Sequence, residues 1–103
     1  VIVVLAADGY PGVPARGGRI EGPRLFASDD DVHTVHAGTA LDADGRLIAA
    51  GGRVLGVVAT AHDLATARTD VYAAIADLDA PTLFYRTDIA ERAASGRIPT
   101  PAL

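Results

Sequence analysis

The residues best suited to bind a ligand lie in segment 51–58, which reads GGRVLGVV. A flexible Gly-Gly turn precedes Arg53, and the apolar run after it is typical of a buried strand. A guanidinium is a rigid fork of donors that fits phosphate or carboxylate, and neighbouring glycines let a ligand approach the backbone. The segment therefore indicates an anion site at the mouth of a strand. The alternative is a hairpin turn before a core strand, with Arg53 paired to an Asp.

A second cation, Arg16, lies in the glycine- and proline-rich segment 8–19, which can continue neither a strand nor a helix. Gly-rich loops that carry Arg can bind anions through backbone N–H groups and side chains together. Neither GxGxxG nor GxxxxGK[ST] is present, so the binding and the structural interpretation of this loop both stay open.

Two histidines and an acidic segment suggest metal chemistry, but neither has the right pattern. On a strand, His33 and His36 would face opposite sides and could not bind one ion. Residues 28–31 lack the alternating carboxylates, central Gly and distal Glu of a calcium loop. We expect no metal site and a solvated acidic turn.

Composition narrows the class of protein. The chain has 103 residues, a net charge of −4, only Arg among its basic side chains, and no Cys. A mildly acidic domain without a basic cluster is a poor nucleic-acid binder. A chain without Cys has no disulfide, thiolate zinc site or Cys nucleophile, and the absence of disulfides fits a cytoplasmic protein. The first apolar run is too short for a signal sequence or membrane span, so we expect a soluble chain. The length is short for an enzyme that closes over several substrates and favours a piece of one.

The strands that position these residues follow from apolar runs and turn signals. Residues 1–6 predict a strand buried on both faces, and residues 24–27 a short strand. Asp44-Gly45 predicts a hairpin, which with Gly51-Gly52 gives a meander of three antiparallel strands over 32–41, 46–50 and 53–60. Alternation in the third strand places apolar residues on both of its faces.

A helix over residues 63–78 has Asp63 as its N-cap and an apolar stripe at spacings of three and four. A short strand over 83–86 follows, and Asp88 with Glu91 resembles a capping box for a short helix over 88–94. Residues 95–103 predict a loose tail. The fold class is therefore α+β: a small antiparallel sheet packed by one amphipathic helix and a short C-terminal helix, in a single domain over 1–94.

Four motifs together resemble a known family. They are LAADGYPG at 5–12, HAGT at 36–39, GGRVLGV at 51–57 and YRTDI at 85–89. Their order and spacing are similar to those of the C-terminal domain of glycinamide ribonucleotide synthetase, also called phosphoribosylamine-glycine ligase. The resemblance extends to about Ala94. The family commonly has Lys where this chain has Arg16, and the tail after Ala94 matches nothing in it.

The resemblance implies a function for the complete enzyme. The family joins phosphoribosylamine and glycine with ATP in purine biosynthesis, using an ATP-grasp fold, magnesium or manganese, and a glycyl-phosphate intermediate. The acidic metal-binding residues and most nucleotide contacts lie in the N-terminal and ATP-grasp domains, so we expect this chain alone to bind no cofactor. Its partners would be those domains, and its role would be to wall the active site.

The resemblance also assigns residues. In related ATP-grasp enzymes an Arg at the start of the matching strand holds the ribose phosphate. The resemblance therefore implies that Arg53 contacts the phosphate, with the backbone of Gly51 and Gly52 beside it. Arg16 is the second candidate for this contact. Possible lining residues are Gly9, Tyr10, Pro11, His36, Gly38 and Thr39, although a hydrogen-bonded strand histidine explains His36 equally. Arg86 and Asp88 are explained by an ion pair and a helix cap, and no residue is expected to be catalytic.

Three hypotheses remain from the sequence. The chain is a part of the ligase that is inactive when isolated, a freestanding phosphate-binding or regulatory module, or a structural domain whose apolar face docks a partner.

Overall fold

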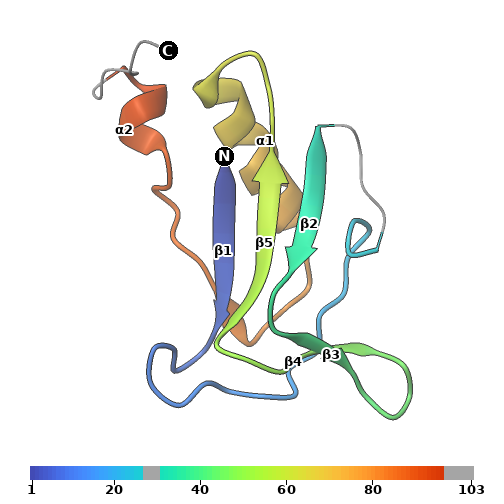
Figure 1. Cartoon of the computed structure of the whole chain (residues 1–103). Helices are drawn as coiled ribbons and strands as arrows, with labels where there is room; N and C mark the ends of the chain where they lie inside the picture. Colours follow the sequence, from blue (N-terminus) through green and yellow to red (C-terminus); the bar gives the residue numbers. More distant parts are fainter. Residues whose placement is uncertain (27–30, 97–103) are drawn as a thin grey trace.

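The computed structural model describes residues 1–26 and 31–96 as two antiparallel sheets and two helices (Figure 1). The elements are β1 (Ile2–Ala7), β2 (Val32–His36), β3 (Thr39–Leu41), β4 (Leu47–Ala49), β5 (Arg53–Ala59), α1 (Leu64–Ala76), β6 (Leu83–Phe84) and α2 (Glu91–Ala94). The larger sheet has the strand order β2-β5-β1-β6, and β3 pairs only with β4. The predicted α+β class is confirmed.

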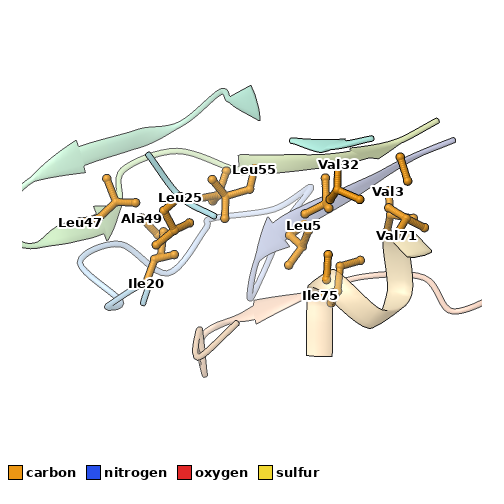
Figure 2. Packing of buried hydrophobic residues seen from close by; sticks show 14 of the residues in the cluster. Val3, Leu5, Ile20, Leu25, Val32, Leu47, Ala49, Leu55, Val71 and Ile75 are labelled. Atoms are coloured by element: carbon orange, nitrogen blue, oxygen red, sulfur yellow. The ribbon is translucent and has the colours of Figure 1, made fainter. Parts of the chain in front are cut away.

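Helix α1 covers one face of the larger sheet, behind it in Figure 1. Asp63 caps the helix by accepting a hydrogen bond from the Thr66 amide at 2.7 Å. The helix buries Ala67, Val71, Ala74 and Ile75. Figure 2 shows Val71 and Ile75 against Val3 and Leu5 of β1. The predicted amphipathic helix is confirmed, with its last helical residue at Ala76.

The core continues from this helix-sheet layer toward the smaller sheet. Leu47 and Ala49 of β4 are buried in the same cluster as Ile20, Leu25 and Leu55 (Figure 2). The Ile20 amide donates to the Leu47 carbonyl at 3.0 Å, which ties the segment before β2 to β4. One continuous core therefore fixes the position of the β3–β4 hairpin.

The strand pairing differs from the predicted meander. The Asp-Gly turn is confirmed, because Asp42 Oδ1 accepts from the amides of Asp44 and Arg46 and Gly45 has φ +78°. However, β4 does not pair with β5, and β5 pairs directly with β2. The predicted strand 32–41 divides at residues 37–38, where two successive amides donate to the Val54 carbonyl. This turn moves β3 out of the larger sheet.

One face of the larger sheet is uncovered in the described structure. Central strand β5 is buried from Val54 to Val57, as its pattern predicted. In contrast, Ile2, Val4 and Val35 are 50%, 46% and 45% exposed. Val4 and Val35 both lie opposite Gly56, in one row across β1, β5 and β2. The prediction that strand 1–6 is buried on both faces is wrong, because α1 packs on only one of them. We call Ile2, Val4, Val35 and Gly56 the open face.

Three smaller predictions also need correction. Pro23 to Phe26 form turns and bends rather than a strand, while Ala27, most of the acidic turn and residues 97–103 lie outside the described residues. The strand expected over 83–86 is only the two residues of β6. The capping box is absent: α2 begins at Glu91 without a side-chain cap, because Asp88 instead binds the Arg86 fork at 3.0 and 2.7 Å.

No helix in the described ranges is long and apolar enough to cross a membrane.

The cap of α1 predicts an acid-dependent loss of stability. Hydrogen bonds from Thr66 lower the pKa of Asp63, so its ionised form stabilises the fold above its ordinary pKa. This contribution is lost as pH falls through the lowered value, below about 4. Asp63→Asn keeps the capping acceptor but cannot titrate. We expect the Tm of the wild type to fall more steeply than that of Asp63→Asn between neutral and acidic pH. The Tm of each protein is measured by circular dichroism at each pH, and an equal fall in Tm for both proteins would contradict this prediction.

Candidate functional site

The predicted anion-binding segment borders a groove of about 510 Å³ that lies over the open face. The groove combines apolar side chains, backbone exposed at glycines, and one cation. It is lined by Ile2, Val4, Tyr10, Val35, Ala37, Gly38, Gly51, Gly52, Arg53, Leu55 and Gly56. The structure thus brings together Tyr10, Gly38, Gly51, Gly52 and Arg53 from the predicted site.

Arg53, the first residue of β5, is exposed, and no described residue forms an ion pair or side-chain hydrogen bond with it. Other arginines do have carboxylate partners: Arg19 binds Asp79 at 2.5 Å, and Arg86 binds Asp88. Asp79 raises the pKa of Arg19, and Arg86 lowers the pKa of Asp88. The alternative in which Arg53 pairs with an Asp at its turn is therefore not what the described structure shows. Its guanidinium remains available to a ligand.

The glycines around Arg53 let chain segments approach one another closely. A Cβ on Gly38 would lie 2.5 Å from the Arg53 carbonyl oxygen, and one on Gly52 would lie 2.5 Å from the Tyr10 ring. Around Gly51 a Cβ would make only an ordinary contact, at 3.5 Å from the Gly38 Cα. The amides of Ala7 and Ala50 donate to the Gly52 and Gly38 carbonyls at 2.7 and 2.8 Å. Three separate segments are thus fixed around the start of β5.

The remaining loop residues lie away from the lining of the groove. Arg16 is exposed and does not line it, nor do Gly9 and Pro11. Gly9 has φ +95°, and a Cβ there would lie 2.2 Å from the Val13 carbonyl oxygen, so the turn requires glycine. The Ala15 amide closes this loop by donating to the Asp8 carbonyl at 2.7 Å.

His36 and Thr39 bond to each other beside the groove rather than in it. The Leu25 carbonyl lies 2.6 Å from His36 Nε2, and because a carbonyl only accepts, that nitrogen carries the proton. Nδ1 then accepts from the Thr39 hydroxyl at 2.9 Å, and the imidazole stacks on Phe26. Both ring nitrogens are engaged, and a ligand role for this pair stays a prediction. Among the described residues, no group of three or more His, Cys, Asp and Glu is placed to hold a metal ion.

A larger hollow of about 710 Å³ lies along residues 86–93 near α2. Arg86 in this hollow is already held by Asp88. Its backbone carbonyl accepts from the Tyr72 hydroxyl at 2.6 Å, while Arg68 donates to the carbonyls of Thr87 and Ile89 at 2.5 and 3.1 Å. These bonds give motif 85–89 a structural role: it ties the segment before α2 to α1.

Sequence reasoning missed the apolar part of the groove. Ile2, Val4 and Val35 line it, although the first two belong to a run that suggested a fully buried strand. A glycine inside a strand marks a close approach, and Gly56 was the available signal. A Cβ at Gly56 would lie 2.9 Å from Ile2 Cδ1.

The fold and the groove define a small α+β domain in which an unpaired cation borders an uncovered apolar sheet face. The family described as "Phosphoribosylglycinamide synthetase, C domain" matches residues 1–92 of this chain. The chain belongs to this family.

Relatives with high identity are named as ligases. The phosphoribosylamine–glycine ligase of Phenylobacterium zucineum is 55% identical to the chain over 90% of the chain's length. That of Caulobacter vibrioides is 47% identical over 94% of the chain's length. In both cases the matched part is 22% of the ligase. The crystal structure of phosphoribosylamine–glycine ligase from Thermotoga maritima matches with a TM-score of 0.70 and 33% identity, over 84% of this chain and 20% of that one. The chain thus spans about a fifth of the length of these proteins.

The close contact at Gly38 predicts that this glycine contributes more to stability than its neighbour Gly51. Gly38→Ala forces a Cβ against the Arg53 carbonyl, which is backbone and cannot swing aside. We expect a loss of roughly 1–3 kcal/mol in the free energy of unfolding. Gly51→Ala, at the facing position with ordinary room, should stay close to the wild type. Urea denaturation of the three proteins tests this, and equal stabilities would show that the two turns do not pack as described.

Proposed function

We propose that this chain is the C-terminal domain of a phosphoribosylamine–glycine ligase and that Arg53 binds the ribose phosphate of phosphoribosylamine. The observation that carries the proposal is the exposed Arg53 side chain, unpaired within the described structure, on the lining of the groove. The family match and the ligases named among the relatives supply the reaction. Arg53 would act by binding and orienting the substrate, since no described residue around it has the arrangement of a nucleophile and base.

The composition of the groove supports a ligand with one anionic end and a compact body. The guanidinium offers two parallel donors to phosphate oxygens, and the backbone at Gly51 and Gly52 lies beside it. Ile2, Val4 and Val35 form the apolar part of the groove. Arg16 does not line the groove, so its predicted contact with the phosphate would need a ligand that extends beyond it.

We further propose that the open face packs against the remaining domains of the ligase. Its three apolar side chains are each about half exposed. Burying apolar surface contributes a favourable free energy of roughly 25 cal/mol per Å². The matched ligases are more than four times as long as the part that this chain covers, so they have ample surface to cover this face. ATP and magnesium or manganese would bind in those other domains. A cytoplasmic location stays a prediction.

The isolated 103-residue chain is expected to fold without ligase activity. We expect no ADP release by the pure chain when ATP, glycine and phosphoribosylamine are all supplied, because the proposed nucleotide and metal contacts belong to other domains. A coupled ADP assay, with a complete ligase as its positive control, measures this. Glycine-dependent ADP release that copurifies with the chain would contradict the proposed division of labour.

In the complete ligase, Arg53→Ala should raise the KM for phosphoribosylamine by roughly tenfold to a hundredfold, the usual range for a lost charge-assisted contact. The KM values for ATP and glycine should change little, because binding of one substrate is lost rather than the chemical step. Arg53→Lys should recover part of the affinity, since it keeps the charge without the fork.

Arg46→Ala is the matched control, because Arg46 is also exposed but lies on the β3–β4 turn outside the groove. It should leave all three KM values unchanged. A well-folded Arg53→Ala enzyme with the wild-type KM for phosphoribosylamine would remove Arg53 from the site. Melting curves of each variant separate this outcome from misfolding.

A further inference from the structure

Tyr10 faces the same groove as Arg53 from a different segment of the chain. Its ring lies on Gly52, where a Cβ would come within 2.5 Å of the nearest ring carbon, Cδ2. The side chain is 39% exposed, and its hydroxyl has no hydrogen-bond partner among the described residues. The hydroxyl of Tyr72, by contrast, donates to the Arg86 carbonyl and accepts from the Ile89 amide. The groove therefore carries two unsatisfied donors, one guanidinium and one phenol.

The backbone holds the two segments that carry these donors against each other. The Tyr10 amide donates to the Ala7 carbonyl at 3.0 Å, and the Ala7 amide donates to the Gly52 carbonyl at 2.7 Å. Ala6 lies directly opposite Arg53 in the β1–β5 ladder. The Tyr10 ring thus packs on Gly52, directly before Arg53, and both side chains start from hydrogen-bonded backbone.

We infer that Tyr10 is a second phosphate-binding residue, whose hydroxyl donates to an oxygen that the Arg53 fork leaves free. A phosphate monoester has three terminal oxygens, of which a bidentate guanidinium engages two. A carboxylate held by the same fork has no third oxygen, so the phenol could donate to it only by sharing an oxygen that the fork already engages. Tyr10 therefore favours a phosphate monoester over a carboxylate such as that of glycine. This inference rests on the proposed function of Arg53.

Removing only the hydroxyl tests this role, because Tyr10→Phe keeps the ring against Gly52. In the complete ligase the KM for phosphoribosylamine should rise roughly tenfold, as for loss of one hydrogen bond to a charged group. The kcat and the KM values for ATP and glycine should stay unchanged. Tyr85→Phe is the matched control, since Tyr85 is 40% exposed and lies outside the groove.

The variants of Arg53 and Tyr10 separate failure of this inference from failure of the proposed function. An unchanged phosphoribosylamine KM in Tyr10→Phe, beside a raised one in Arg53→Ala, overturns the role of Tyr10 and keeps that of Arg53. Wild-type values in both variants overturn both. If Tyr10→Phe instead lowers the Tm and raises every KM, its hydroxyl is structural, and the inference fails. The expected result is a raised KM for one substrate at an unchanged Tm.

Discussion

The arrangement of the groove depends on one backbone contact, the approach of the turn after β2 to the start of β5. Gly38 lies so close to the Arg53 carbonyl that no side chain fits between them. The amides of Ala37 and Gly38 both donate to the Val54 carbonyl, and the Ala50 amide donates back to Gly38. This contact ends β2, sends β3 into a separate sheet, and leaves the first residue of β5 on the surface. A position without a Cβ thus determines both the topology and the site.

What distinguishes Arg53 is its position on the groove, because Arg16, Arg46 and Arg92 form no ion pair with a described residue either. There are 13 acidic residues for 9 basic ones, so carboxylate partners are abundant. Three arginines, Arg19, Arg24 and Arg86, form ion pairs with carboxylates at the surface, where an ion pair contributes little to stability. Leaving Arg53 unpaired therefore costs the fold almost nothing. The same side chain gains a function if a bound anion supplies the partner that the described residues do not.

Local patterns predicted the elements well and their pairing less well. The cap at Asp63 and the turn at Gly45 are confirmed because their determinants lie within a few residues. The division of strand 32–41 depends instead on contact between Gly38 and a distant turn, and the burial of β1 depends on which face α1 covers. Both features depend on tertiary contacts, which cannot be predicted from the alternation of apolar residues or from strand propensity. For the site, residues 51–53 and Tyr10 were predicted from the sequence and do line the groove. Arg16 and His36 were also predicted but lie outside its lining. Proximity to a motif in the sequence does not fix the position of a side chain.

The open face and the groove share residues, which couples the two proposed roles of this domain. All four residues of the open face, Ile2, Val4, Val35 and Gly56, also line the groove. A neighbouring domain that covers the open face would remove water from one side of the groove and lower the effective dielectric constant around Arg53. Charge interactions strengthen as the dielectric falls, so the contact between guanidinium and phosphate would become tighter than in the isolated domain. On the two proposals together, the uncovered sheet would be part of the site as well as a docking surface. Covering the apolar row would then strengthen phosphate binding by Arg53 in the assembled enzyme.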